Sequence, residues 1–75
     1  MTKIKAIEWA LQKAREELRI CGLVYRDQKV RDEWANDERL GLDNFISRRQ
    51  AQARTLQALI TEFEQMQSTA SEGGV

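Results

Sequence analysis

The feature that most constrains this 75-residue chain is a pair of mostly apolar stripes whose members recur at alternating spacings of three and four. The first stripe comprises Ile4, Ile7, Leu11, Ala14, Leu18, Cys21 and Tyr25. The second comprises Leu42, Phe45, Arg49, Gln52, Leu56, Leu59, Phe63 and Met66. Side chains at this spacing lie on one face of an α-helix, and such faces pack against other helices. The sequence therefore predicts an all-α fold.

The two stripes correspond to helices of similar length, roughly 33 and 38 Å at a rise of ~1.5 Å per residue. Helices of matched length joined by a short connector pack as antiparallel neighbours. We therefore predict a single helical domain over residues 1–67, an antiparallel hairpin of helices at about 3–25 and 43–67 with a short connecting helix within 27–39. The alternative is a monomeric three-helix bundle, in which the connector folds back over the first helix. Residues 68–75 are expected to form a structureless tail.

Four residues are expected to mark the ends of the helices. Thr2 is the predicted N-cap of the first helix. Gly22 leaves two interpretations open, because a glycine can end a helix in the left-handed conformation or be tolerated inside a helix that continues, in the longest case to about Ala35. Gly41 is the predicted terminator of the connecting helix, and Asp43 is the predicted N-cap of the last helix.

The sequence lacks two of the usual means of stabilising so small a domain. A single cysteine, Cys21, cannot form an internal disulfide, and the absence of histidine rules out a Cys–His structural zinc site. Self-association remains as a means of stabilisation. We therefore predict a homodimer or higher oligomer that forms a helical bundle. Cys21 itself lies on the first stripe and is expected to be a small buried hydrophobe rather than a nucleophile.

The charges are balanced overall but unevenly distributed. The chain has 12 basic and 12 acidic residues, with eight basic and four acidic in residues 1–31 but five acidic and one basic in residues 32–45. A neutral total argues against general affinity for nucleic acid or an anionic membrane. The sequence shows no apolar run typical of a membrane span or a signal peptide. Because a free thiol suits a reducing compartment, we expect a cytoplasmic protein.

The first helix carries a second apolar face. At about 100° per residue, Ala6, Trp9, Ile20, Leu23 and Val24 lie opposite the main stripe. The connector has few apolar residues to cover this face, so we predict a surface for a protein target or for self-association. The predicted partner-binding residues are Trp9, Ile20, Leu23, Val30 and Trp34. The alternative is that the two tryptophans are buried core residues.

Arg49 is the unexpected member of the second stripe, because it occupies a position where an apolar side chain is expected. An unpaired charge in a core is costly, so its guanidinium must reach solvent or meet an acid such as Glu17 or Asp27. The other hypothesis is a site for an anion or an acidic partner, formed by Arg48, Arg49 and Arg54. A nucleotide bound at a subunit interface would fit that site.

Enzymatic and metal chemistry have little support in the sequence. There is no histidine, no Gly-rich phosphate loop and no nucleophile with an activating base, so we predict no catalytic residues and no cofactor. The acidic segment 32–45 does not follow the EF-hand pattern, so we predict no metal. The leading hypothesis is a non-catalytic adaptor or inhibitor. The alternatives are a nucleic-acid-binding regulator that uses the basic N-terminal segment and a protein that sequesters a small anion.

Overall fold

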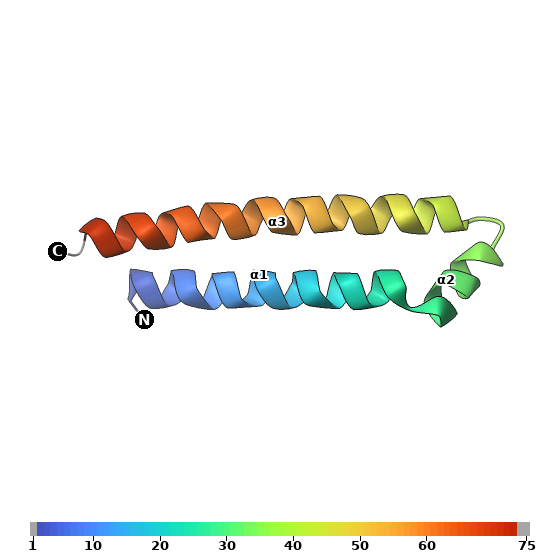
Figure 1. Cartoon of the computed structure of the whole chain (residues 1–75), viewed down its shortest axis with the longest axis horizontal. Coiled ribbons are helices and arrows are strands. Elements are labelled where there is room, and N and C mark those ends of the chain that lie inside the picture. The colour runs from blue at the N-terminus through green and yellow to red at the C-terminus, as the bar shows by residue number, and fades with distance from the viewer. Residues whose placement is uncertain (1, 74–75) are drawn as a thin grey trace.

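The computed structural model describes residues 2–73, which form three helices: α1 (Lys3–Arg26), α2 (Gln28–Ala35) and α3 (Leu42–Gly73). α1 and α3 run antiparallel side by side, and α2 joins them at one end, which we call the closed end (Figure 1). The hairpin measures 56 × 16 × 16 Å. The predicted all-α hairpin with a short connecting helix is confirmed. α2 lies across the closed end rather than along α1, so the described residues do not form a three-helix bundle.

Two capping side chains set the boundaries of α1 and α2. Thr2 is the N-cap of α1, as predicted, and its hydroxyl accepts a hydrogen bond from the backbone N–H of Lys5 at 3.2 Å. α1 continues through Gly22 and ends at Arg26. The break comes at Asp27, whose backbone is extended (φ −74°, ψ 109°) and whose carboxylate accepts from the first backbone N–H groups of α2. Asp27 is therefore a helix-breaking cap that our sequence reasoning missed.

The connection from α2 to α3 depends on a glycine in the left-handed conformation. α2 ends at Ala35, earlier than the predicted limit of 39, and a turn leads to Gly41 with φ 76°. The backbone N–H of Gly41 donates to the carbonyl of Trp34, and the carbonyl of Gly41 accepts from the N–H of Phe45. The prediction that Asp43 caps α3 is wrong, because α3 begins at Leu42 and Asp43 lies in its first turn. There its carboxylate still interacts favourably with the positive end of the helix.

α3 is longer than predicted. We expected a helix end at about residue 67 and no structure in 68–75, but α3 continues to Gly73. The physical reason is that residues 68–72 include no proline or glycine, so nothing stops the helix before the first glycine. Residues 74 and 75, the remainder of the predicted tail, lie outside the described residues.

The core runs along the seam between α1 and α3. Its buried side chains are Ile7, Leu11, Ala14 and Cys21 of α1 with Phe45 and Ile60 of α3. Burial of Cys21 is as predicted, and its Sγ donates to the carbonyl of Arg49 at 3.5 Å. The second stripe was partly misassigned: Ile60 packs against Leu11 and Ala14, whereas its neighbour Leu59 is 42% exposed.

An aromatic cluster fills the closed end. Phe45 is fully buried, stacked with Tyr25 at 6.4 Å between ring centroids and tilted against Trp34 at 5.5 Å. The guanidinium of Arg31 lies over the Tyr25 ring at 4.5 Å, and its Nε donates to the Tyr25 carbonyl. Tyr25 of α1 and Trp34 of α2 therefore both contact Phe45 of α3, and the Trp34 contact holds α2 against the hairpin.

Candidate functional site

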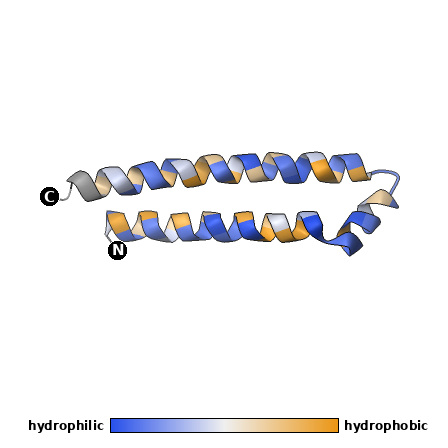
Figure 2. Cartoon of the chain, viewed as in Figure 1, coloured by the Kyte–Doolittle hydropathy of each residue, from blue (hydrophilic) through white to orange (hydrophobic). Residues whose placement is uncertain are grey.

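The candidate site is an apolar surface on α1 that faces away from α3. It consists of Trp9, Ile20 and Leu23, which we call the outer α1 face, and their exposed fractions are 57%, 40% and 53%. Figure 2 shows hydrophobic bands on the outer side of α1 as well as on the side toward α3. The helix pitch explains the grouping, because these residues lie about half a turn around α1 from the buried seam. The structure thus leaves three of the five predicted partner-binding residues exposed on one side of α1, with Trp9 about 16 Å along the helix from Ile20.

Trp9 is the largest side chain on this face. Its ring contacts the ammonium of Lys13 on the next turn, with Nζ 5.6 Å from the ring centroid. A cation–π contact at an exposed site is worth about 0.5–1 kcal/mol, so it can hold the indole along α1 without burying it. More than half of the indole-bearing residue remains open to water. The prediction that Trp9 is not covered by the connector is therefore correct for the described residues.

The other two predicted partner-binding residues lie elsewhere. Val30 and Trp34 belong to α2 and are half-buried at the closed end. Trp34 packs on Phe45, and the guanidinium of Arg48 lies over the Trp34 ring, 5.7 Å from the ring centroid. Since Trp34 is engaged in this cluster, it does not extend the outer α1 face around Trp9.

The three predicted anion-binding arginines do not converge. Arg48 contacts Trp34, Arg54 is exposed on α3, and Arg49 lies in the seam with its guanidinium 5.8 Å from the Phe45 ring. The predicted ion pair of Arg49 is wrong for the described residues, since no carboxylate pairs with it there. Its Nε is buried without a hydrogen-bond partner, as is Oε1 of Gln52. Sequence reasoning identified Arg49 as anomalous and expected an acid or solvent beside its guanidinium, whereas the Phe45 ring lies there.

Two hollows lie along the seam. One, of about 310 Å³, has mostly apolar walls and two guanidinium groups, and its lining comprises Leu18, Cys21, Gly22, Tyr25 and Arg26 of α1 with Arg49, Gln50 and Ala53 of α3. Arg26 was not among the predicted anion-binding residues. It lines this hollow together with Arg49, and its Nε donates to the carbonyl of Gly22, one helical turn before it, at 3.3 Å.

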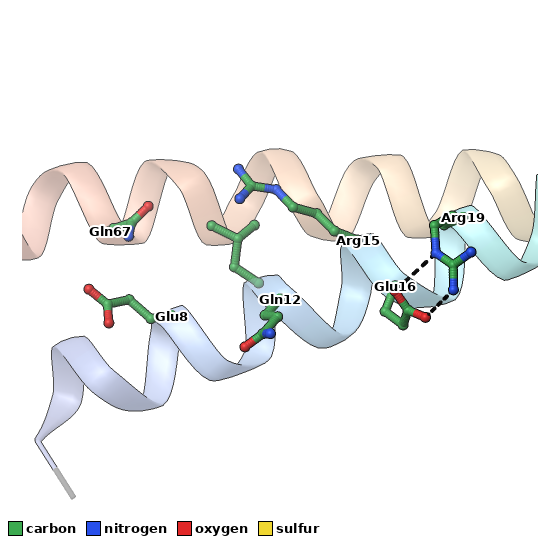
Figure 3. Close-up of a pocket in the computed structure, with 7 residues that line it drawn as sticks. Glu8, Gln12, Arg15, Glu16, Arg19 and Gln67 are labelled. Atoms are coloured by element: carbon green, nitrogen blue, oxygen red, sulfur yellow. Dashed lines mark hydrogen bonds and ion pairs between the residues drawn. The ribbon is translucent and has the colours of Figure 1, made fainter.

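The other hollow, of about 370 Å³, is polar (Figure 3). Glu8, Gln12, Arg15, Glu16 and Arg19 of α1 and Gln67 of α3 surround Leu11 there. Arg15 pairs with Glu64 across the seam at 3.2 Å, and Arg19 donates two hydrogen bonds to Glu16. These hydrogen bonds lower the pKa of the Glu16 carboxyl below its ordinary value of 4.5. Three of the four charged residues that line this hollow, Arg15, Glu16 and Arg19, are therefore already held in ion pairs.

The described residues contain neither a group of three or more candidate metal ligands nor a nucleophile beside a base. Within the same part of the chain, every helix is too short or too polar to cross a membrane. Comparison with protein-family models, curated proteins and solved structures finds no match to this chain. The outer α1 face and the Arg26–Arg49 hollow are therefore two candidate binding surfaces of the described residues.

Proposed function

We propose that this protein is a non-catalytic protein–protein interaction module that binds a target through the outer α1 face. The observation that carries the proposal is the exposure of Trp9, Ile20 and Leu23 on one side of a single helix. Large apolar side chains scattered singly on a surface need no explanation, but three on the same side of one helix, two of them a single turn apart, indicate an interaction site. An adaptor or an inhibitor would both use such a face.

The energetics support a helix-in-groove contact. Complete burial of a large apolar side chain contributes about 1.5–3 kcal/mol, and tryptophan is the residue most enriched among the energetic centres of interfaces. Residues at positions 9, 20 and 23 lie along almost four turns of one helix at ~3.6 residues per turn, a length that a target groove can hold. Lys13 and Glu16 lie between Trp9 and Ile20, so a target would need polar groups opposite the middle of this face.

The test compares wild-type protein with a double variant, Trp9→Gln and Leu23→Gln. Both proteins are immobilised, and targets are captured from the source organism. A target retained by the wild type alone is then purified, and its Kd is measured for both proteins. We expect the double variant to bind roughly 100-fold more weakly, since two anchor side chains are lost. Arg54→Gln, on the exposed side of α3, is the control and should bind as the wild type does. Equal retention of every target by wild type and double variant would contradict the proposal.

A second candidate function is the binding of a small organic anion in the Arg26–Arg49 hollow. It is supported by two guanidinium groups from different helices facing one apolar hollow whose lining includes no acidic residue. A ligand specific to the folded state raises the melting temperature, so a panel of nucleotides and aromatic carboxylates tests it directly. We expect stabilisation in the wild type and none in Arg49→Met. If no compound stabilises the wild type, this candidate is rejected.

A further inference from the structure

The chain exposes more surface than a compact protein of its mass. Its accessible surface is 5825 Å², whereas the area scaling for folded monomers gives about 4,700 Å² for 8.7 kDa. Its radius of gyration is 16.7 Å, against about 11 Å for a compact domain of this length. The difference in area is roughly 1,100 Å², and a standard-size interface removes about 800 Å² from each partner. One more hairpin packed alongside would therefore account for most of the excess.

The structure shows which long face is suited to a second hairpin. The Arg15–Glu64 ion pair marks one long face, which is the polar one seen in Figure 3. Ala6 and Val24 lie nine positions on either side of Arg15, which places them about 180° around α1 from it. On α3, Leu59 and Met66 lie about 140–160° around the helix from Glu64. The long face opposite the ion pair therefore has apolar side chains on both helices, with the charged Lys13 and Glu17 among them, and its Leu59 and Met66 are 42% and 40% exposed.

On α1, this opposite face has a symmetric pattern. Its residues are Ala6, Ala10, Lys13, Glu17, Ile20 and Val24, spaced by four, three, four, three and four positions. We call them the symmetric stripe, because each residue before Arg15 has a counterpart equally far after it. The counterparts are Ala6 with Val24, Ala10 with Ile20, and Lys13 with Glu17.

We propose that a second copy of this chain packs antiparallel along the symmetric stripe, with a two-fold axis level with Arg15. In that register small residues meet large ones, since Ala6 of one copy faces Val24 of the other, and Ala10 faces Ile20. Alternating small and large side chains let two helices interdigitate closely. Lys13 of each copy faces Glu17 of the other, so the two-fold axis produces two equivalent ion pairs. A two-fold interface must be self-complementary in this way.

A parallel dimer on the same stripe is disfavoured by its charges. It would place Lys13 against Lys13 and Glu17 against Glu17, and like charges facing each other across an interface are repulsive. The antiparallel arrangement also suits α3. Because Ile60 packs against Leu11 and Ala14, Leu59 lies near the level of Arg15, and the two-fold axis brings it close to Leu59 of the second copy. The product is a four-helix bundle with its two closed ends at opposite ends.

Charge reversal in sedimentation experiments tests the register. Lys13→Glu and Glu17→Lys each create two like-charge contacts across the interface. We therefore expect the Kd for dimer dissociation to rise roughly tenfold or more in either variant. The double variant with both substitutions exchanges the charges and should restore dimerisation to near the wild-type level.

Lys5→Glu with Glu8→Lys is the control: it reverses one basic and one acidic residue that lie off the symmetric stripe, and it should leave the dimer unchanged. Circular dichroism confirms that each variant folds. A wild type that sediments as a monomer at 100 µM overturns the proposal, and so does a double variant as weak as the singles.

A distance measurement tests the orientation. Cys21→Ala removes the native cysteine, and Lys3→Cys then provides one site per copy for a spin label. Position 3 lies twelve residues from the level of the two-fold axis at Arg15. The antiparallel arrangement predicts a separation of about 36 Å between the two helix positions, whereas a parallel one predicts about 10 Å. A short distance would overturn the antiparallel register. Ile20 belongs to both the outer α1 face and the symmetric stripe, so in the dimer Trp9 and Leu23 remain for the target. A monomer that still binds a target through these two residues would contradict only the dimer.

Discussion

The indole of Trp34 packs at 53° on the ring of Phe45, with 5.5 Å between ring centroids, and this contact joins α2 to α3. Phe45 is fully buried because Tyr25 stacks on it as well. The closed end is therefore a small core of its own, separate from the seam around Ile60. Its integrity decides whether α2 stays docked at the end of the hairpin.

Phe45→Ala is expected to be the most destabilising of the single truncations in this cluster. Removing a fully buried phenylalanine costs about 3–5 kcal/mol, from lost burial and from the cavity left behind. A domain of this length has only about 4–11 kcal/mol of stability in all. Urea unfolding of wild type and variant measures the difference. Leu23→Ala, at a side chain that is 53% exposed, is the control and should cost about 1 kcal/mol or less. Similar losses in the two variants would contradict the assignment of Phe45 as a core residue.

The two interior glycines should respond to alanine in opposite directions. Gly41 has φ 76°, a conformation that costs other residues about 1–2 kcal/mol, so Gly41→Ala should lower the free energy of unfolding by that amount. Gly22 lies inside α1, and a Cβ there would meet Arg26 Nη2 at 3.5 Å, an ordinary contact. Gly22→Ala should therefore raise the free energy of unfolding by about 1 kcal/mol. Thermal and urea denaturation of both variants check the signs. Stabilisation by the Gly41 substitution would be inconsistent with the left-handed turn.

Gln52→Leu is expected to stabilise the protein. Oε1 of Gln52 is buried in the seam without a hydrogen-bond partner, and a buried unsatisfied polar atom costs about 1–3 kcal/mol. Leucine replaces it with an apolar side chain of similar size, so the melting temperature should rise. Gln57→Leu, at an exposed position of α3, is the matched control and should leave stability nearly unchanged. A drop in the melting temperature of Gln52→Leu would show that the amide has a partner in solution.

The Glu16–Arg19 pair predicts a weak acid sensitivity. Because hydrogen bonds from Arg19 lower the pKa of Glu16 in the folded protein, the pair contributes stability above the ordinary value of 4.5, and that contribution is lost as pH falls through the lower folded value. Both side chains are exposed to solvent, so the effect is small. Melting temperatures of wild type and Glu16→Gln should differ slightly at pH 6 and converge as the pH falls further below 4.5. A difference that grows with acidification would contradict the sign of the shift.

The sequence alone determined the architecture and several local features of this protein. Helical periodicity, the Thr2 cap and the chain reversal near Gly41 each depend on residues within about four positions of one another, so local chemistry decides them. Asp27 belongs to the same class, since its side chain and extended backbone end α1, and the sequence already contained that signal. The second apolar face of α1 was also readable, because helix pitch alone places Trp9 and Leu23 together.

Only the tertiary structure decided which of several adjacent side chains entered the core. Leu59 and Ile60 are neighbours on α3, and the packing of Ile60 against Ala14 turned Leu59 outward. Likewise, the Phe45 ring lies beside the Arg49 guanidinium where an acid or solvent was expected. These choices depend on the rotation of one helix against another. Periodicity leaves that rotation open by about one residue, or 100°, and the contacts between distant segments settle it.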